Sequence, residues 1–294
     1  MAQILVLGMA AVDFVLSMDA FPTDAAKYRA KAADIVGGGP AANAAVAIAR
    51  LGGEPSFIGR LGNDPLADLV LGDLEAAGVG TAHVHRATGG RSSFSSVYVD
   101  ARGERQIVNF RGDGLTEEVD WIARLPAARA VLVDTRWPNG AAAALRMARE
   151  WGVPGVVDGE APIDPRLLEN ASHLALSAQG LASLEPGDDL AAALERLAAR
   201  VPGWVCVTDG ANGVWYTGAS GIDHIPAFRV DVVDTLAAGD VWHGAFALAL
   251  AEGQAEAEAI RFANATAALK CMTFGGRSGT PDRAAVLTFL KEYV

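Results

Sequence analysis

The apolar positions of this chain follow two alternating patterns: short continuous runs and longer segments with a helical repeat. Short apolar runs predict buried strands, and apolar positions spaced three and four apart predict helices. The predicted strands cover residues 4–7, 57–62, 130–134, 153–157, 174–176 and 205–207. The predicted helices cover residues 40–53, 66–79, 140–151 and 188–200. This alternation predicts an α/β fold with a largely parallel sheet that is covered on both faces.

One part of the chain departs from this alternation. Residues 92–112 alternate with period two around an Ala-Arg-Gly-Glu turn, which predicts an antiparallel hairpin. Residues 14–36 also look extended rather than helical. We see no internal repeat and no long linker, so we expect a single domain over residues 1–294. Its segments at about 14–36 and 92–112 would form a small β-sheet lid.

Composition narrows the classes of partner. The chain has 294 residues, 51% of them apolar, so it can bury one large core. A formal net charge of −11 argues against binding to nucleic acid or to an anionic membrane. The N-terminus lacks the basic segment of a secretion signal, and no apolar run is long enough to span a bilayer. Cys206 and Cys271 lie in apolar contexts without metal-ligand spacing, which is typical of reduced thiols in a cytoplasmic protein.

Polar and glycine-rich segments follow several of the predicted strands. Asp13 lies shortly after the first strand, Gly-Gly-Gly-Pro-Ala-Ala-Asn (37–43) opens a helix, and Arg136 follows the strand at 130–134. Asp240 opens the last long apolar helix. Ligands of open α/β sheets bind beyond the carboxyl ends of the strands, so we expect the functional site there.

The segment Asp-Thr-Leu-Ala-Ala-Gly-Asp (234–240) combines small residues with a carboxylate at a helix start. Ala237, Ala238 and Gly239 would let a phosphate approach the free N–H groups of the first helical turn. Asp240 would repel that phosphate, unless it takes the proton from an attacking hydroxyl. Alternatively, Asp240 only complements the helix dipole, which is worth ~0.3–1 kcal/mol. The segment alone leaves both interpretations open.

Several segments resemble the signature regions of the PfkB-type (ribokinase-like) carbohydrate kinases. In chain order they are LGMAAVD, GGGPAANAAVAIARLGG, FIGRLGNDPLA, VTDGANGV, DTLAAGDVWHGAF and FANATAALKCMTFGGRSGTP. The resemblance spans essentially the whole chain. It implies a ribokinase-like three-layer α/β/α sandwich with a mostly parallel central sheet and a small β-sheet lid. It also implies an ATP-dependent sugar kinase.

The resemblance assigns roles to individual positions. Asp240 would be the catalytic base, and the backbone of Ala237, Ala238 and Gly239 the anion hole. The positions that match sugar-binding residues are Asp13, Gly38, Gly39 and Asn43. The positions that match the nucleotide pocket are Thr208, Gly210 and Asn264. The competing interpretations are that Asn43 caps a helix and that residues 208–210 form only a turn at a strand end.

The implied cofactors are ATP and Mg²⁺, and a monovalent-cation site for K⁺ near Asp234. One motif of the family is missing, because Ser177 and Gly180 stand where its Asn-x-x-Glu motif supports Mg²⁺. This departure favours a rival hypothesis, a non-catalytic sugar-binding regulator. The retained Asp240 argues against that rival. His243, one turn further along the helix, is expected to pack rather than to act as a base.

Three further residues bear on the sugar. Lys27 in the expected lid, Asn109 at the end of its hairpin and Arg136 would together suit a substrate with an anionic head group. The surrounding segments resemble the branch of the family that contains bacterial sulfofructose kinases. The resemblance implies phosphorylation of 6-deoxy-6-sulfofructose at its C1 hydroxyl. Alternatively, Lys27 and Arg136 are solvated surface charges.

Other acceptors remain open at this point. They include fructose 6-phosphate, 2-keto-3-deoxygluconate, fructose and ribose. A nucleoside would need an aromatic shelf, for which the candidates are Phe94, Tyr98 and Phe110. The apolar Phe-Ser-Ser-Val-Tyr-Val strand of the lid favours a homodimer through the lid.

Overall fold

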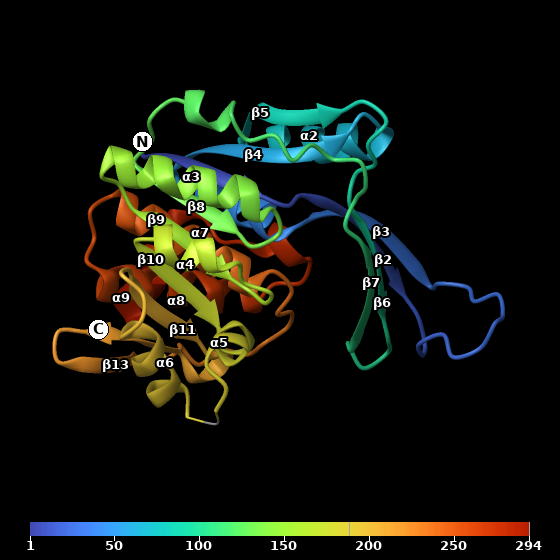
Figure 1. Ribbon diagram of the computed structural model, residues 1–294. Helices are drawn as coiled ribbons and strands as arrows, with labels where there is room; N and C mark the ends of the chain where they lie inside the picture. Colours follow the sequence, from blue (N-terminus) through green and yellow to red (C-terminus); the bar gives the residue numbers. More distant parts are fainter. Residues whose placement is uncertain (188, 294) are drawn as a thin grey trace.

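The computed structural model describes residues 1–187 and 189–293 and is built around a nine-stranded sheet (Figure 1). The strand order is β13-β12-β11-β10-β9-β8-β1-β4-β5. The bounds are β1 Gln3–Gly8, β4 Glu54–Gly62, β5 Gly80–Ala87, β8 Ala130–Asp134, β9 Gly155–Gly159, β10 His173–Ser177, β11 Trp204–Thr208, β12 Val214–Gly218 and β13 Gly221–Ile225. Strands β5 to β11 of this order run parallel, and β12 and β13 add an antiparallel edge.

The central strands are apolar because both faces of the sheet are covered. Every residue of β8 is buried, and in β1 every residue after Gln3 is buried. Val6 of β1 pairs with Leu132 on one side and Phe57 on the other. This register continues the same buried layer across three strands, which is why their sequences are nearly continuous apolar runs.

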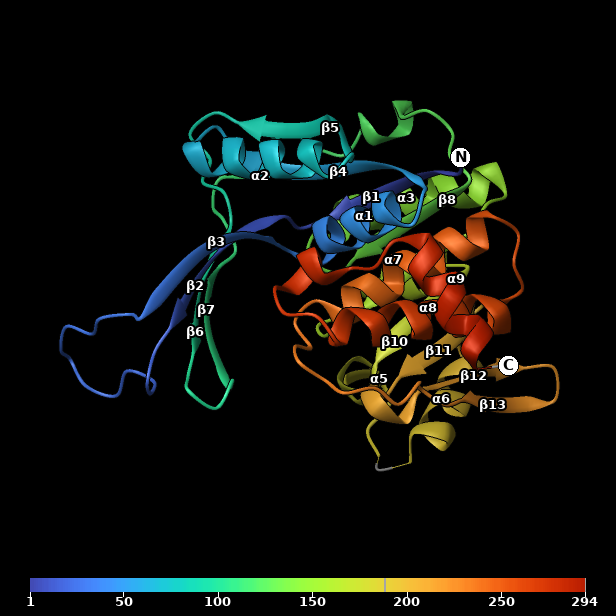
Figure 2. The same ribbon diagram turned by 180° about the vertical axis from the view of Figure 1, so that it is seen from behind.

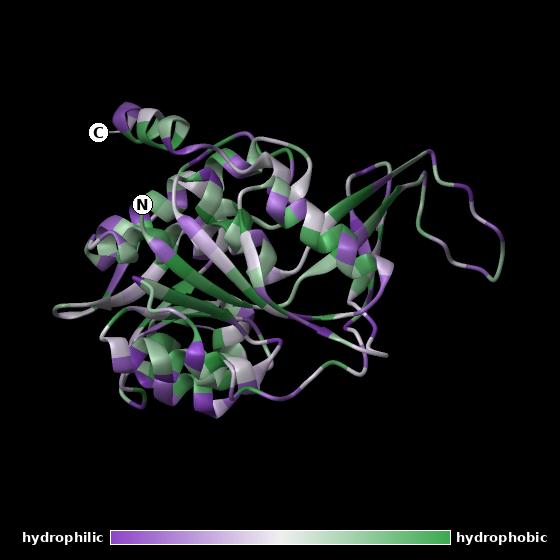
Figure 3. Cartoon of the chain, turned by 90° about the horizontal axis from the view of Figure 1, so that it is seen from above, coloured by the Kyte–Doolittle hydropathy of each residue, from purple (hydrophilic) through white to green (hydrophobic). Residues whose placement is uncertain are grey.

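Helices form the two outer layers. One face carries α1 Pro40–Arg50, α2 Pro65–Ala76, α7 Ala238–Ala251, α8 Glu256–Cys271 and α9 Arg283–Glu292 (Figure 2). The other face carries α3 Pro138–Trp151, α4 Pro165–Asn170, α5 Ala178–Leu184 and α6 Leu190–Ala198. Short 3₁₀ turns cover Ile122–Arg124 (η1), Gly210–Asn212 (η2) and Gly276–Gly279 (η3). In Figure 3 the hydrophobic residues concentrate on the strands between the two helical layers.

The predicted α/β/α arrangement is confirmed, with small shifts at the helix ends. The helix expected at 66–79 begins at Pro65 because Asp64 caps it by accepting a hydrogen bond from Ala67 N. The helix expected at 188–200 is observed as Leu190–Ala198, and residue 188 lies outside the described residues. The strands β5, β12 and β13 were not predicted, because their polar and glycine residues weaken the apolar pattern.

A separate four-stranded sheet projects from the body as a lid (Figure 1). Its order is β3-β2-β6-β7, with bounds β2 Ala11–Ser17, β3 Ala32–Gly38, β6 Phe94–Val99 and β7 Arg105–Phe110. Its strands lie in and next to the two segments expected from the sequence, 14–36 and 92–112: β2 begins earlier, at Ala11, and β3 ends later, at Gly38. Residues 18–31 join β2 to β3 as an irregular connection that extends farthest from the central sheet. Across the described residues, no helix has both the length and the apolar character needed to cross a bilayer.

Candidate active site

The start of α7 forms the centre of the site. Ala237 precedes the helix in the left-handed region at φ 62°, and it is the only non-glycine residue with positive φ in the part of the chain that the structure describes. No side chain caps the first turn of α7, and Gly239 faces open space. The first-turn N–H groups therefore face an accessible concavity that suits an anion. Strained backbone of this kind is concentrated at functional sites.

Asp240 lies in the first turn of α7 and contacts α1. Asn43 donates a hydrogen bond from Nδ2 to Asp240 Oδ2 at 2.6 Å. Burial, together with repulsion by Asp158, raises the pKa of Asp240 to about 7, while the Asn43 hydrogen bond opposes the shift. A carboxyl whose pKa lies near neutrality is well matched to general-base catalysis at that pH.

A buried pair lies behind Asp240. His243 Nδ1 is 3.4 Å from Asp158 Oδ1, and His243 Nε2 is 3.1 Å from the carbonyl oxygen of Ala175. A carbonyl only accepts, so Nε2 carries a proton. Burial raises the pKa of Asp158 well above its usual range, and the nearby carboxylate of Glu160 acts in the same direction. His243 is buried, in keeping with the packing role expected from the sequence.

The lid and the glycine-rich turn form the other wall. Asp13 of β2 is half-buried, and a Cβ at Gly38 of β3 would overlap its carboxylate. Gly39 adopts φ 95°, and a Cβ there would overlap the carbonyl oxygen of Met9. Both glycines are therefore required for the close approach of the turn to β1 and β2. Burial raises the pKa of Asp13, against the hydrogen bond from Ser95.

Arg277 joins this wall, although the sequence did not single it out. Its Nη1 donates to Asn43 Oδ1 at 3.4 Å, and its Nη2 forms an ion pair with Asp73. Burial lowers its pKa to about 10, and the charge of Asp13 opposes that shift. Because the guanidinium faces Oδ1 of Asn43, the amide nitrogen of Asn43 is directed to Asp240. The only sequence signal is its place in Gly-Gly-Arg-Ser-Gly after α8.

Asp134 at the end of β8 was also missed. Its Oδ2 accepts from Met9 N at 2.7 Å and from Ala41 N at 3.3 Å, and its Oδ1 accepts from Arg136 N at 2.8 Å. These bonds tie the end of β1 to the start of α1, which holds the 37–39 turn in place. A buried aspartate directly after Val-Leu-Val was the available signal.

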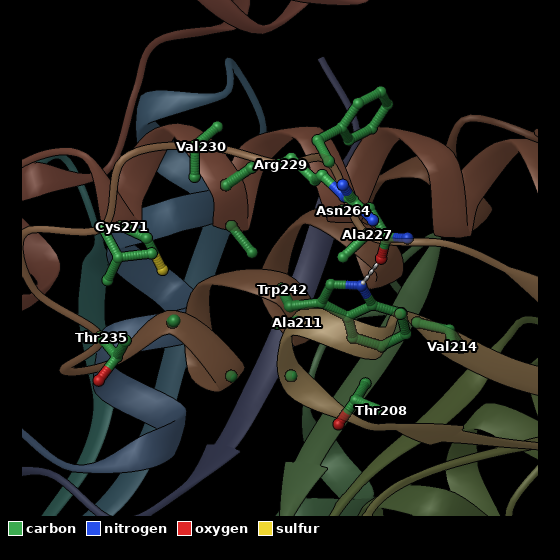
Figure 4. A pocket seen from close by; sticks show the side chains of 18 residues that line it. Thr208, Ala211, Val214, Ala227, Arg229, Val230, Thr235, Trp242, Asn264 and Cys271 are labelled. Carbon is green, nitrogen blue, oxygen red and sulfur yellow. Dashed lines mark hydrogen bonds between the residues drawn. The ribbon is translucent and has the colours of Figure 1, made fainter.

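The predicted nucleotide residues line one cavity of 540 Å³ (Figure 4). Its lining includes Thr208, Gly210 and Asn264 together with Ala238 and Gly239 of the expected anion hole. The cavity is mostly apolar and has a volume typical of small-molecule sites. Asn264 Oδ1 accepts a hydrogen bond of 2.7 Å from Trp242 Nε1, so its side chain fixes one wall of the cavity.

The three residues expected at an anionic head group come from three different segments: Arg136 directly follows β8, Asn109 lies in β7 and Lys27 lies in the connection 18–31. Arg136 donates to the carbonyl oxygen of Ala161 at 3.1 Å and forms an ion pair with Glu160. Asn109 donates to Ser95 Oγ at 3.0 Å, which places it on the lid row that also contains Asp13. Lys27 is exposed, and it belongs to the irregular connection 18–31, which extends away from the body of the protein (Figure 1).

The residues around the missing Asn-x-x-Glu motif do not supply a metal ligand set. Ser177 Oγ accepts from Gly180 N at 3.0 Å and so caps α5. Within residues 1–187 and 189–293, no three His, Cys, Asp or Glu side chains form a group that could hold a metal ion. Magnesium typically keeps several waters and is bound largely through substrate phosphates, a mode that needs no such group of protein ligands.

Asp234 does not fit a bound monovalent cation, contrary to expectation. Its Oδ1 accepts from Leu236 N at 2.9 Å and Arg105 Nη1 at 3.3 Å. Its Oδ2 accepts from Gly276 N at 2.9 Å and Gly275 N at 3.1 Å, and lies 3.3 Å from Lys270 Nζ. Two carboxylate oxygens offer about four lone-pair sites, so this carboxylate has no free position for an ion.

The fold and the site together define a kinase that phosphorylates a small molecule. Residues 1–283 match the profile of the pfkB family carbohydrate kinases. The ribokinase of Bacillus subtilis is 30% identical over 97% of this chain and 98% of its own length. The ATP-dependent ribose-1-phosphate kinase of Halopiger xanaduensis is 32% identical over 99% of each chain.

A solved structure gives the same result. Arabidopsis thaliana ribokinase, complexed with ribose and ATP, superposes with a TM-score of 0.89 at 26% identity and covers 99% of each chain. The chain therefore belongs to the pfkB family of carbohydrate kinases, with the ribokinase-like fold. It is an ATP-dependent sugar kinase.

Proposed function

We propose that the chain transfers the γ-phosphate of ATP to a hydroxyl of a small sugar, with Asp240 as the base. The observation that carries this proposal is the position of Asp240. It bonds Asn43 on the lid side and directly follows Ala238 and Gly239, which line the 540 Å³ cavity on the other side. A carboxylate between a polar pocket and a nucleotide-sized cavity can take a proton from one ligand while the other donates its phosphate.

In the proposed reaction the sugar lies against Asp13, Asn43 and the Gly38–Gly39 turn. The γ-phosphate lies at the start of α7, where the N–H groups of residues 237–239 stabilise the charge of the transition state. Asp240 accepts the proton of the attacking hydroxyl. Mg²⁺ bound with the phosphates of ATP would supply neutralisation of their charge. Thr208, Gly210 and Asn264 line the remainder of the nucleotide cavity.

For the acceptor we propose 6-deoxy-6-sulfofructose, phosphorylated at C1. The support is Arg136 at the carboxyl edge of β8, where a fixed anion could replace Glu160 as the partner of the guanidinium. Asn109 on the lid row of Asp13 would contribute an amide. Lys27 would reach the substrate only if the 18–31 connection moves toward the body.

A neutral pentose or hexose is the second candidate. It is favoured by the existing Arg136–Glu160 pair, which neutralises the cation that an anionic head would need. A ribokinase and a ribose-1-phosphate kinase among the relatives also point to a ribose-based acceptor. A nucleoside is less well supported, because Phe94 already packs against Phe14 at 6.2 Å and Phe110 at 5.5 Å between ring centroids.

The deciding experiment is ADP release measured with sulfofructose, fructose 6-phosphate, 2-keto-3-deoxygluconate, fructose, ribose and nucleosides. Sulfofructose should give the highest kcat/KM, and Arg136→Met should reduce that value selectively. A preference for ribose or fructose that Arg136→Met leaves unchanged would remove the anionic acceptor. Absence of turnover with every acceptor, in the presence of ATP binding, would support the non-catalytic regulator.

We also propose that two copies associate through their lids. Ile35 of β3 is 62% exposed, and Ile107 and Val108 of β7 are 53% and 61% exposed. These strands are the two edges of the lid sheet, and apolar edges of this kind are commonly covered by a partner. Light scattering after size exclusion should give a dimer, and Ile35→Asp with Val108→Asp should give a monomer.

A further inference from the structure

Lys270 near the end of α8 is a fully buried lysine, with 0% of its side chain exposed. Its Nζ donates to the backbone oxygen of Asp234 at 2.7 Å and lies 3.3 Å from Asp234 Oδ2. Lysine is almost never fully buried unless its charge is paired. Asp234 therefore pairs the buried charge of Lys270, in the segment that leads to α7.

The ammonium lies where two segments of the site meet. Asp234 begins the stretch that ends in Ala237 and the first turn of α7, and its Oδ2 accepts the N–H groups of Gly275 and Gly276. Those glycines directly precede Arg277. The backbone N of Asp234 donates to the carbonyl oxygen of Cys271 at 3.0 Å, which attaches the same stretch to the end of α8. The Lys270–Asp234 pair thus fixes the stretch 234–237, which leads to the start of α7, relative to the turn that carries Arg277.

The lid also contacts Asp234, through Arg105. Arg105 of β7 lies 3.3 Å from Asp234 Oδ1 and donates from Nη2 to Thr235 Oγ1 at 2.7 Å. Asp234 also lines a cavity of 470 Å³ between the lid and the body, so the region is open to solvent ions. A dissolved cation that entered this cavity would meet two fixed positive groups and a carboxylate with no free lone pair.

We propose that the Lys270 ammonium is a built-in monovalent cation for the anion hole, so that this chain needs no K⁺. An ammonium group carries the same charge as K⁺ and has a similar radius, and it makes the contacts to the Asp234 carbonyl and carboxylate that an ion would make. Lys270 is a positioning residue, because it acts through Asp234 and the 275–277 turn. The effect on turnover rests on the proposed kinase function, whereas the absence of K⁺ binding does not.

The first test compares the wild-type protein in KCl and in tetramethylammonium chloride at equal ionic strength, with Mg²⁺ supplied as its chloride and ATP as its Tris salt, both free of K⁺ and Na⁺. We expect kcat to agree within about twofold and the melting temperature to be the same in both salts. A K⁺-specific rise in melting temperature, or activation by about tenfold or more, would overturn the proposal. The melting measurement needs no turnover, so it separates this proposal from the kinase assignment.

The second test uses Lys270→Met, which keeps the length of the side chain and removes its charge. We expect kcat to fall by about tenfold or more in tetramethylammonium and to recover partly in KCl, together with a K⁺-specific rise in melting temperature. Lys270→Arg should stay independent of K⁺, and Lys291→Met on the exposed face of α9 is the matched control. If Lys270→Met keeps wild-type kcat and melting temperature in both salts, the ammonium has no positioning role.

Discussion

Asn43 Nδ2 donates to Asp240 Oδ2 at 2.6 Å, although the two residues are 197 positions apart in the chain. The bond joins the first helix after the lid to the helix that begins at the anion hole. It also sets the direction of the carboxylate, because Arg277 holds the other end of the Asn43 amide. In the proposed reaction, sugar binding and proton transfer therefore share the side chain of Asn43.

The pH dependence should report Asp240. Its pKa of about 7 means that the carboxyl is protonated, and unable to accept a proton, in slightly acidic solution. We expect kcat/KM to fall as the pH decreases through about 7. Asp158→Asn removes a repelling carboxylate, so the acidic limb should move to lower pH. Rate profiles between about pH 5 and 9 test this, with Asp120→Asn at an exposed position as control.

The free energy of unfolding should also depend on the protonation of Asp240. Rising pH should increase the activity but decrease the stability. The folded pKa of about 7 lies above the ordinary value of 3.8, so between these values the folded state holds a proton that the unfolded state has released. The free energy of unfolding should therefore decrease as pH rises through this window, and the penalty is complete above it. Asp240→Asn should melt at higher temperature than wild type at pH values above the folded pKa, while its turnover falls by ~10²–10⁴-fold. Equal melting temperatures at alkaline pH would contradict the buried-charge explanation.

Arg277 should control sugar affinity. Arg277→Gln removes the guanidinium that faces Asn43 and Asp13, and hydrogen bonds to charged groups contribute about 1.5–3 kcal/mol. We expect KM for the sugar to rise by roughly tenfold to a hundredfold, with KM for ATP nearly unchanged. Asp73→Asn keeps the guanidinium and removes its ion-pair partner, so it separates loss of the pair from loss of the Asn43 contact.

The backbone at Ala237 should accept glycine and reject branched residues. Left-handed geometry costs an L-residue about 1–2 kcal/mol, and glycine pays no such penalty. Ala237→Gly should keep activity and show equal or higher stability, since the released strain offsets the added flexibility of the unfolded chain. Ala237→Val should lower both. Calorimetry and steady-state kinetics on the two variants check this, and a Val variant as active as wild type would refute it.

Local patterns were sufficient to predict the layers of the fold. The buried strands at 4–7 and 130–134 are continuous apolar runs, and the hairpin segment of the lid, 92–112, alternates with period two in its sequence. The start of α7 was predicted for a similar reason, because the anion hole and Asp240 lie within one contiguous segment. The nucleotide cavity follows from the same helix, since Ala238 and Gly239 form part of its lining.

The remaining parts of the site depend on contacts between distant segments. Arg136 was expected to face an anionic substrate, and the sequence did not show that Glu160, 24 positions later, pairs with it in the absence of substrate. Asp234 was expected to bind a cation, but the ammonium of Lys270, 36 positions later in the chain, donates to its backbone oxygen and, as we propose, takes the place of the ion. Arg277 reaches Asn43 across 234 positions. A sequence pattern shows which groups are charged, but it does not show which of them neutralise one another.

The lid has a consequence for engineering. Asp13 and Asn109 lie on strands β2 and β7 of the lid, whereas the base and the anion hole lie within residues 234–240 of the body. The lid part of the proposed acceptor site is thus encoded in stretches of the polypeptide separate from the proposed base and anion hole, whereas Arg136 and Arg277 belong to the body. Exchange of residues 11–38 and 94–110 with those of a relative would be a modular way to change the sugar while the phosphorylating machinery is left in place.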